Sequence, residues 1–144
     1  MSVIEESTPS IKQQKVTFKD IVYLVKRIVL IANVMPVVAG YMLALYFTNE
    51  SFMANIDTFL FTMIGSTLTI AGALILNNWY EADLDHKMAR TQKRPTVTGV
   101  MSMETVLILG IASSVLGLGL IAFTTFEALV YAFLGWFTYV VLYT

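Results

Sequence analysis

The chain has 144 residues, of which 57% are hydrophobic and only 13% are charged, and its mean hydropathy is +0.73. This composition excludes an ordinary soluble domain and is typical of a membrane protein. The formal net charge is −1 and there are no cysteines, so disulfides and thiolate metal sites are excluded, and we expect no nucleic-acid partner.

The chain is expected to begin with a cytoplasmic tail, residues 1–20, followed by a transmembrane domain, residues 21–144. Four apolar segments without charged residues lie in that domain, at 28–47, 58–76, 105–123 and 128–144. At about 1.5 Å per residue, the first three can each cross a hydrocarbon core of about 30 Å, and the fourth is shorter. The sequence therefore predicts an all-α membrane protein with four transmembrane helices.

The basic residues predict the orientation of these helices. All nine lie before the first apolar segment or between the second and the third: Lys12, Lys15, Lys19, Lys26, Arg27, Lys87, Arg90, Lys93 and Arg94. Positive charge stays on the cytoplasmic side of a membrane. We therefore expect a multi-pass protein of the bacterial cytoplasmic membrane, with the N-terminus and residues 77–104 in the cytoplasm.

Small residues recur within the second and third apolar segments. They are Gly65 and Gly72 in the second segment and Gly110, Ser114 and Gly117 in the third. Small side chains let helices approach closely in lipid, so these positions predict a helix–helix contact. Asn33 in the first segment is expected to form a hydrogen bond between helices.

Acidic and amide side chains gather at the inner end of the second segment, at Asn77, Asn78, Glu81, Asp83 and Asp85. On a helix, residues four apart are rotated by only about 40°, so Asn77, Glu81 and Asp85 share a face with Asn78 beside it. Like charges at this spacing repel, and a cation would reverse the effect. Mg²⁺ with a diphosphate suits such oxygen ligands. The alternative is a solvated helix end, in which Asp83 pairs with Lys87 four residues later.

Four cations follow these acids directly, at Lys87, Arg90, Lys93 and Arg94. Lysine and arginine can bind the phosphate oxygens that a metal ion does not reach. The cytoplasmic preference of positive charge explains how many cations there are, but not why they adjoin the acids. The arrangement favours a site for a metal ion and a diphosphate.

The two runs together resemble a known motif. Asn77-Asn78-x-x-Glu81-x-Asp83-x-Asp85, followed by Arg90-Thr91-x-x-Arg94-Pro95, is similar to the first aspartate-rich motif of the UbiA superfamily of intramembrane prenyltransferases. Within that superfamily it most resembles the protohaem IX farnesyltransferases, also called haem O synthases. The resemblance implies an all-α bundle of nine helices around a central cavity, of which this chain carries the first four.

The resemblance also implies roles for individual residues. The catalytic residues would be Asn77, Asn78, Glu81 and Asp85. Three of these would be ligands of the Mg²⁺ cofactor, namely Asn77, Glu81 and Asp85, and the diphosphate of the substrate would be bound by Lys87, Arg90 and Arg94. Glu81 stands where the family usually has Asp, and its extra methylene changes the geometry of ligation.

The implied reaction transfers a farnesyl group from farnesyl diphosphate to a vinyl group of haem b, giving haem O for haem A biosynthesis. The implied partners are these substrates, the lipid bilayer and haem A synthase. A second aspartate-rich motif would lie beyond Thr144, so we expect an N-terminal fragment that is inactive by itself. Two alternatives remain: a UbiA-type enzyme acting on a quinone or chlorin precursor, and a non-catalytic membrane scaffold or cation-binding subunit.

Overall fold

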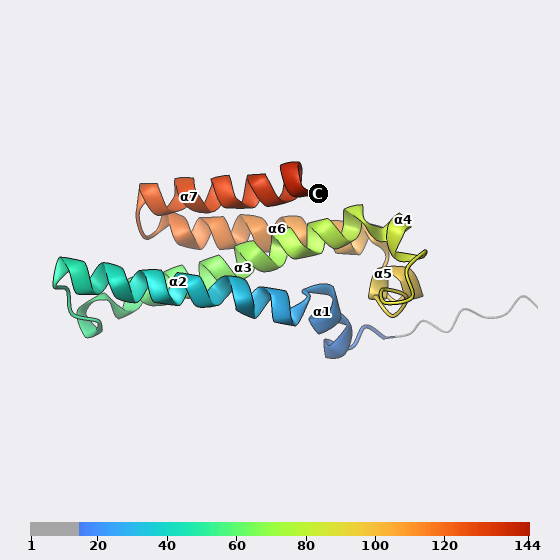
Figure 1. The fold of residues 1–144 in the computed structure, drawn as a ribbon, viewed down its shortest axis with the longest axis horizontal. Coiled ribbons are helices and arrows are strands. Elements are labelled where there is room, and N and C mark those ends of the chain that lie inside the picture. Colours follow the sequence, from blue (N-terminus) through green and yellow to red (C-terminus); the bar gives the residue numbers. More distant parts are fainter. Residues whose placement is uncertain (1–14) are drawn as a thin grey trace, which may run out of the picture.

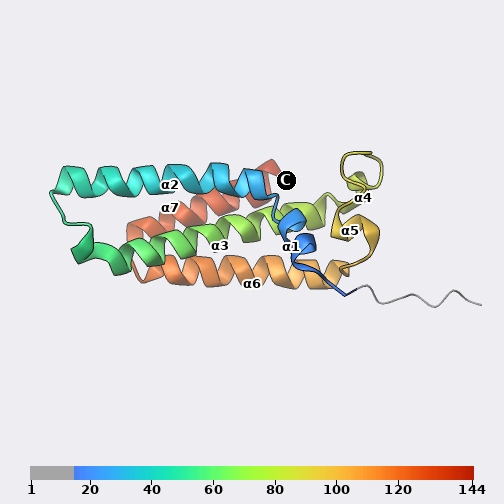
Figure 2. The same cartoon turned by 90° about the horizontal axis from the view of Figure 1, so that it is seen from below.

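The structure, a computed structural model, describes residues 15–144, which contain helices and no strand. The elements are α1 (Phe18–Leu24), α2 (Arg27–Thr48), the 3-10 turn η1 (Met53–Asn55), α3 (Ile56–Tyr80), α4 (Ala82–Asp85), α5 (Pro95–Thr98), α6 (Met103–Ala122), α7 (Phe126–Phe137) and the π-helical turn η2 (Thr138–Tyr143). The long helices α2, α3, α6 and α7 run side by side as a bundle, with α1, α4 and α5 gathered at one end (Figures 1 and 2).

Four stretches of the described chain are long and apolar enough to cross a membrane: Arg27–Thr48, Met53–Tyr80, Met103–Ala122 and Phe126–Tyr143. Each coincides with one of the predicted apolar segments to within a few residues, so the prediction of an all-α, multi-pass membrane protein is confirmed. Helix α1 begins at Phe18, inside the segment assigned to a tail, and residues 1–14 of that segment lie outside the described residues.

A polar side chain caps the N-terminal end of each of the two neighbouring helices α6 and α7. The Ser102 hydroxyl accepts a hydrogen bond from the Thr105 amide at 3.2 Å and starts α6, and the Thr125 hydroxyl accepts one from the Ala128 amide at 3.1 Å and starts α7. Serine and threonine are preferred at this position because they satisfy amide groups that lack a partner within the helix. The short connection between α6 and α7 makes them antiparallel neighbours.

The predicted contact between small residues is the seam between α3 and α6. A Cβ atom added at Gly72 would lie 2.6 Å from the Ser114 amide nitrogen and 2.8 Å from the Gly110 carbonyl oxygen. One added at Gly117 would lie 2.6 Å from the Gly65 carbonyl oxygen. These distances leave no room for a side chain, so the prediction is confirmed. The backbones of α3 and α6 can touch because the glycines at this seam have no side chain.

Helix α7 is attached to this seam by a polar contact. The Trp136 indole nitrogen donates a hydrogen bond to the Ser114 hydroxyl at 2.9 Å, and that hydroxyl donates to the Gly110 carbonyl oxygen at 2.8 Å. Asn33 differs from expectation, because its amide donates to the Val29 carbonyl oxygen of its own helix at 2.8 Å and its side chain is exposed. The Ser114 hydroxyl therefore joins α6 to α7, whereas the hydrogen bond of Asn33 stays within α2.

Candidate functional site

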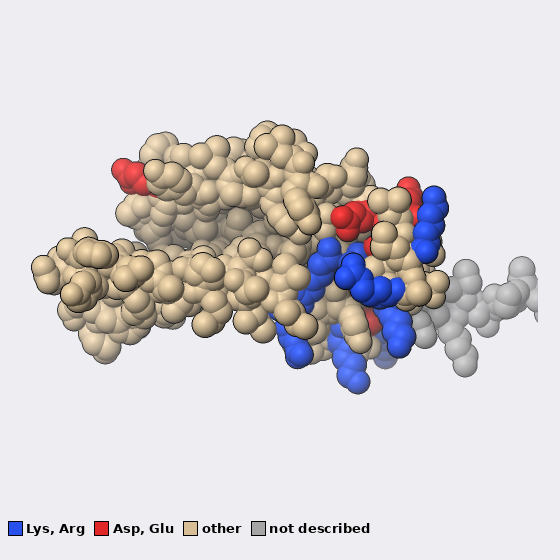
Figure 3. Space-filling view, in the orientation of Figure 1, with Lys and Arg blue, Asp and Glu red and all other residues tan. Residues whose placement is uncertain are grey.

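Charged side chains gather at the end of the molecule that carries α1, α4 and α5. Figure 3 shows Lys and Arg side chains close together over this end, with acidic side chains next to them. The rest of the face in view is almost entirely uncharged. Opposite charges at the mouth of an apolar bundle mark this end as the candidate site.

The backbone of the acidic motif turns at Glu81. Helix α3 ends at Tyr80 and the short α4 follows, yet the Glu81 amide still donates to the Asn77 carbonyl at 2.9 Å and the Asp85 amide to the Glu81 carbonyl at 3.0 Å. The four-residue relation of Asn77, Glu81 and Asp85 therefore survives the break. Asp83 is exposed, and because α4 ends before Lys87, no ion pair joins these two residues in the described structure.

The two site carboxylates face the same arginine. Asp85 is only 3% exposed, and its Oδ2 forms an ion pair with Nη1 of Arg94. The same nitrogen lies 4.0 Å from Oε2 of Glu81, whose side chain is about one-third exposed. A carboxylate as deeply buried as Asp85 requires a charged partner. Arg94 supplies that charge and leaves the Glu81 carboxylate the more accessible of the two.

A lysine from the start of α2 completes the cluster. The Lys26 ammonium donates a hydrogen bond to Oδ1 of Asn77 at 2.7 Å and lies 3.8 Å from Oε2 of Glu81. Burial lowers the pKa of Lys26, the positive charge of Arg94 lowers it further, and the negative charge of Glu81 opposes both. The Asn77 amide nitrogen donates to the Thr144 hydroxyl at 3.2 Å, so Asn77 joins three parts of the chain.

Asn78 lies behind the cluster and is fully buried. Its amide nitrogen donates to the Leu24 carbonyl oxygen at the end of α1, while its own Oδ1 is buried and has no hydrogen-bond partner among the described residues. A buried acceptor without a partner is costly. Through its hydrogen bond to Leu24, Asn78 holds the end of α1 against the end of α3.

The Arg-Thr-x-x-Arg-Pro run, residues 90–95, lies in the loop after α4, and its residues have structural roles there. The Thr91 hydroxyl donates to the Asp85 carbonyl oxygen at 2.8 Å and fixes the start of the loop. Pro95 is buried and begins α5, where its restricted φ suits the first position of a helix. Arg94 precedes it as the capping residue, and its side chain turns back to Asp85. The run therefore holds the Arg94 side chain beside Asp85.

The structure brings most of the predicted site residues together. Those at the cluster are Asn77, Glu81, Asp85 and Arg94, with Asn78 directly behind. Lys87 and Arg90 are exposed and form no ion pair within residues 15–144. Sequence reasoning missed Lys26 and the anchoring role of Thr91. The only signal for Lys26 was its place at the end of a basic segment, which the orientation of the helices already explains.

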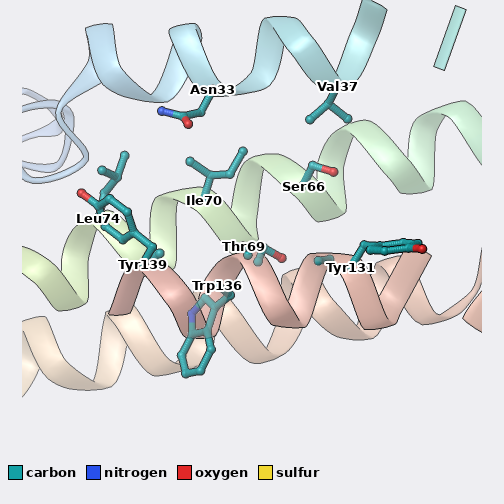
Figure 4. Close-up of a pocket in the computed structure, with 12 residues that line it drawn as sticks. Asn33, Val37, Ser66, Thr69, Ile70, Leu74, Tyr131, Trp136 and Tyr139 are labelled. Atoms are coloured by element: carbon teal, nitrogen blue, oxygen red, sulfur yellow. The ribbon is translucent and has the colours of Figure 1, made fainter. Parts of the chain in front are cut away.

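A cavity adjoins the cluster on the membrane side. Its volume is about 310 Å³, and it lies between α2, α3 and α7 with Asn33, Ile70 and Tyr139 among the residues that line it (Figure 4). Leu74 also lines it, one helical turn before the two asparagines. An apolar cavity beside a charged cluster suits a ligand with an apolar chain and an anionic head.

The donor set of the cluster is compatible with Mg²⁺. Within the described part of the chain, no three His, Asp or Glu side chains lie close enough to hold a metal ion by themselves. The carboxylates of Glu81 and Asp85 together with Oδ1 of Asn77 offer only hard oxygen ligands. Mg²⁺ prefers such ligands and commonly takes the rest of its shell from water and substrate phosphates. The chemistry of these side chains therefore fits the ion.

Comparison with known proteins identifies relatives of the chain. The UbiA prenyltransferase family profile matches residues 33–144. A protein of Oceanobacillus iheyensis named protoheme IX farnesyltransferase is 48% identical over 143 residues, which are 99% of this chain and 46% of that protein. Protoheme IX farnesyltransferase 2 of Bacillus subtilis is 45% identical over 132 residues, 92% of this chain and 43% of its own length. The chain thus spans about half the length of these curated relatives, and no solved structure matches it.

Proposed function

The chain belongs to the UbiA prenyltransferase family, and on that premise we propose that it supplies the diphosphate site of an enzyme that transfers a farnesyl group to haem b. The observation that carries the proposal is the pairing of Glu81 and Asp85 with cations at the end of the bundle, beyond Leu74, which lines an apolar cavity. The names of the relatives supply the farnesyl group and protohaem IX, which is haem b, and the resemblance of the motif supplies the diphosphate donor. The product, haem O, would pass to haem A synthase, the partner that the resemblance implies.

In this proposal the cluster binds the anionic head of farnesyl diphosphate and the cavity takes part of its apolar chain. Mg²⁺, held by Asn77, Glu81 and Asp85, would neutralise the growing charge of the departing diphosphate. Arg94 contacts both carboxylates and is placed to donate to phosphate oxygens as well. The exposed Lys87 and Arg90 lie on the loop that follows, and their proposed role is to bind the phosphate group that faces the cytoplasm.

The proposed reaction is an electrophilic alkylation. The carbon–oxygen bond of farnesyl diphosphate breaks and its electron pair leaves with the diphosphate. The terminal carbon of the haem vinyl group then attacks the allylic cation. Water adds to the neighbouring carbon and loses a proton, which leaves a hydroxyl group. An apolar cavity excludes water from the first step, so that water does not capture the allylic cation.

The diphosphate site can be tested with the whole chain by the capture of radiolabelled inorganic pyrophosphate on protein immobilised in detergent. We expect capture that requires Mg²⁺ and is lost in EDTA. The double variant Glu81→Gln/Asp85→Asn should lose it, because neither carboxylate then attracts the metal ion. Asp83→Asn, an exposed change of equal charge, is the control. Equal capture by the double variant would contradict the proposed site.

We also propose that the N-terminus and the loop that follows α4 face the bacterial cytoplasm. The chain has no cysteine, so single cysteines can be placed at the exposed Gln92 and Glu50. An impermeant thiol reagent added to intact cells should label Glu50→Cys and leave Gln92→Cys unlabelled until the membrane is opened. The reverse pattern would show the opposite orientation. Thr91 is unsuitable because its side chain is buried.

A further inference from the structure

Lys26 occupies a position that the proposed function leaves unexplained. We propose that Lys26 is a diphosphate-binding residue of this site, held in place by a left-handed corner between α1 and α2 that Asn78 fastens. The inference rests on the proposed function and extends the set of substrate-binding residues to the start of the first long helix. It also gives Asn78 a positioning role in place of direct contact with the substrate.

The corner itself is unusual. Lys26 has φ 50° and ψ 61°, a left-handed conformation that a residue with a Cβ atom adopts rarely. The backbone around it is fully engaged: its amide donates to the Tyr23 carbonyl at 3.2 Å, and its carbonyl accepts from the Val29 amide at 2.8 Å and starts α2. A residue kept in such a conformation without being glycine points to a use for its side chain.

Asn78 holds this corner from behind. Its amide donates to the carbonyl oxygen of Leu24, two residues before Lys26. The Leu24 side chain is fully buried and packs against Ile75, Met101 and Val106. The end of α1 is thus fixed by a hydrogen bond and by apolar packing. The Lys26 side chain therefore extends from a rigid backbone corner, and its ammonium lies within the charged cluster.

The contacts of the ammonium leave it attractive to an anion. Its short hydrogen bond, 2.7 Å, goes to the neutral amide of Asn77, whereas the Glu81 carboxylate lies at 3.8 Å. A metal ion on the carboxylates would further weaken their attraction for Lys26. The Glu81 carboxylate, at 3.8 Å, compensates this partly buried ammonium only weakly, and phosphate oxygens would supply a closer anion. Lys26 is therefore placed to bind the diphosphate that the metal ion brings.

Arg27 provides the matched comparison. It follows Lys26 directly and carries the same charge, but its side chain is exposed and lies in no ion pair of the described structure. If a positive charge were needed here only to orient the chain in the membrane, Lys26 and Arg27 would serve equally well. If Lys26 acts through the site, the two residues must differ in their effect on binding of the diphosphate.

The test measures the affinity of the whole chain for inorganic pyrophosphate in the presence of Mg²⁺. We expect Lys26→Gln to weaken binding about tenfold or more, because it removes a charge-assisted hydrogen bond. Arg27→Gln should remain within about twofold of wild type, because its charge is exposed, and Lys26→Arg should recover part of the loss. Unchanged affinity in Lys26→Gln would overturn the inference and leave the proposed site intact. A wild-type chain that does not bind pyrophosphate would overturn both.

Two further variants separate binding from structure. Glycine accepts the left-handed corner, so Lys26→Gly should lose affinity as Lys26→Gln does, while its thermal stability equals or exceeds that of wild type. Lost stability with unchanged affinity would show a purely structural lysine. If Asn78 acts through Lys26, Asn78→Ala should weaken binding in the wild type but add nothing to Lys26→Gln. Losses that multiply would overturn the positioning role, and Lys26→Gly decides the role of the lysine even where Asn78→Ala does not fold.

Discussion

Asp85→Asn is expected to lower haem O formation about a hundredfold or more. The assay uses a chimera in which this chain replaces the matching segment of the Oceanobacillus iheyensis relative, and haem O is quantified by mass spectrometry. Asp85 is 3% exposed and paired with Arg94. The change removes a proposed anionic metal ligand and also the ion-pair partner of Arg94. The loss of a single preorganised charge-stabilising group commonly lowers turnover by about 100-fold or more.

Two controls make this result interpretable. Asp83→Asn changes the same charge two residues away at an exposed position, and its turnover should stay close to wild type. Asp85→Asn also leaves Arg94 without its closest anion, so the amount of folded protein in the membrane must be matched. Near wild-type turnover of Asp85→Asn would mean that Asp85 is not needed for the reaction and serves only as a structural partner of Arg94.

Gly117→Val is expected to have the largest effect on stability. A Cβ atom at Gly117 would collide with the backbone of α3 at Gly65 and Thr69, and a backbone cannot move aside as a flexible side chain can. Separating α3 from α6 would also break the contact that anchors α7 through Ser114 and Trp136. Overpacking typically destabilises by about 1–3 kcal/mol, and we expect at least the upper end of this range because backbone atoms block the new side chain.

The measurement is the thermal unfolding of the chain in detergent, followed by circular dichroism. Gly119→Val on the same helix is the matched control, because a Cβ atom there meets no atom within 4 Å. It should unfold at nearly the temperature of wild type, whereas Gly117→Val should unfold far below it or fail to accumulate. Equal unfolding temperatures for the two variants would show that α3 and α6 do not meet at this seam.

The helices were predictable because the bilayer sets their length. A run such as 28–47 must be helical to satisfy its backbone in lipid, and the observed α2 adds only one residue at each end. The seam was predictable for a related reason, since small residues at helical spacing have few uses besides close packing. The position of Asn33 was not, because the sequence does not show which face of α2 meets another helix.

The site was predictable only where its residues are neighbours in the sequence. Four-residue spacing found Asn77, Glu81 and Asp85, and backbone hydrogen bonds keep that relation across the break at Glu81. Lys26 was missed because 51 residues separate it from Asn77, and the two meet only through the packing of α1 and α2 on α3. Lys87 was included because charge in a sequence does not reveal which cations point into a cluster and which remain exposed.

The most direct test of the central proposal is haem O formation by the unsubstituted chimera in a bacterium that lacks its own haem O synthase. The chimera joins this chain, through Thr144, to the part of the Oceanobacillus iheyensis relative that the chain does not match. If the chain supplies the diphosphate site of a haem farnesyltransferase, haem O will be detected by mass spectrometry and will depend on Glu81 and Asp85. A chimera that reaches the membrane in folded form and makes no haem O would contradict the account.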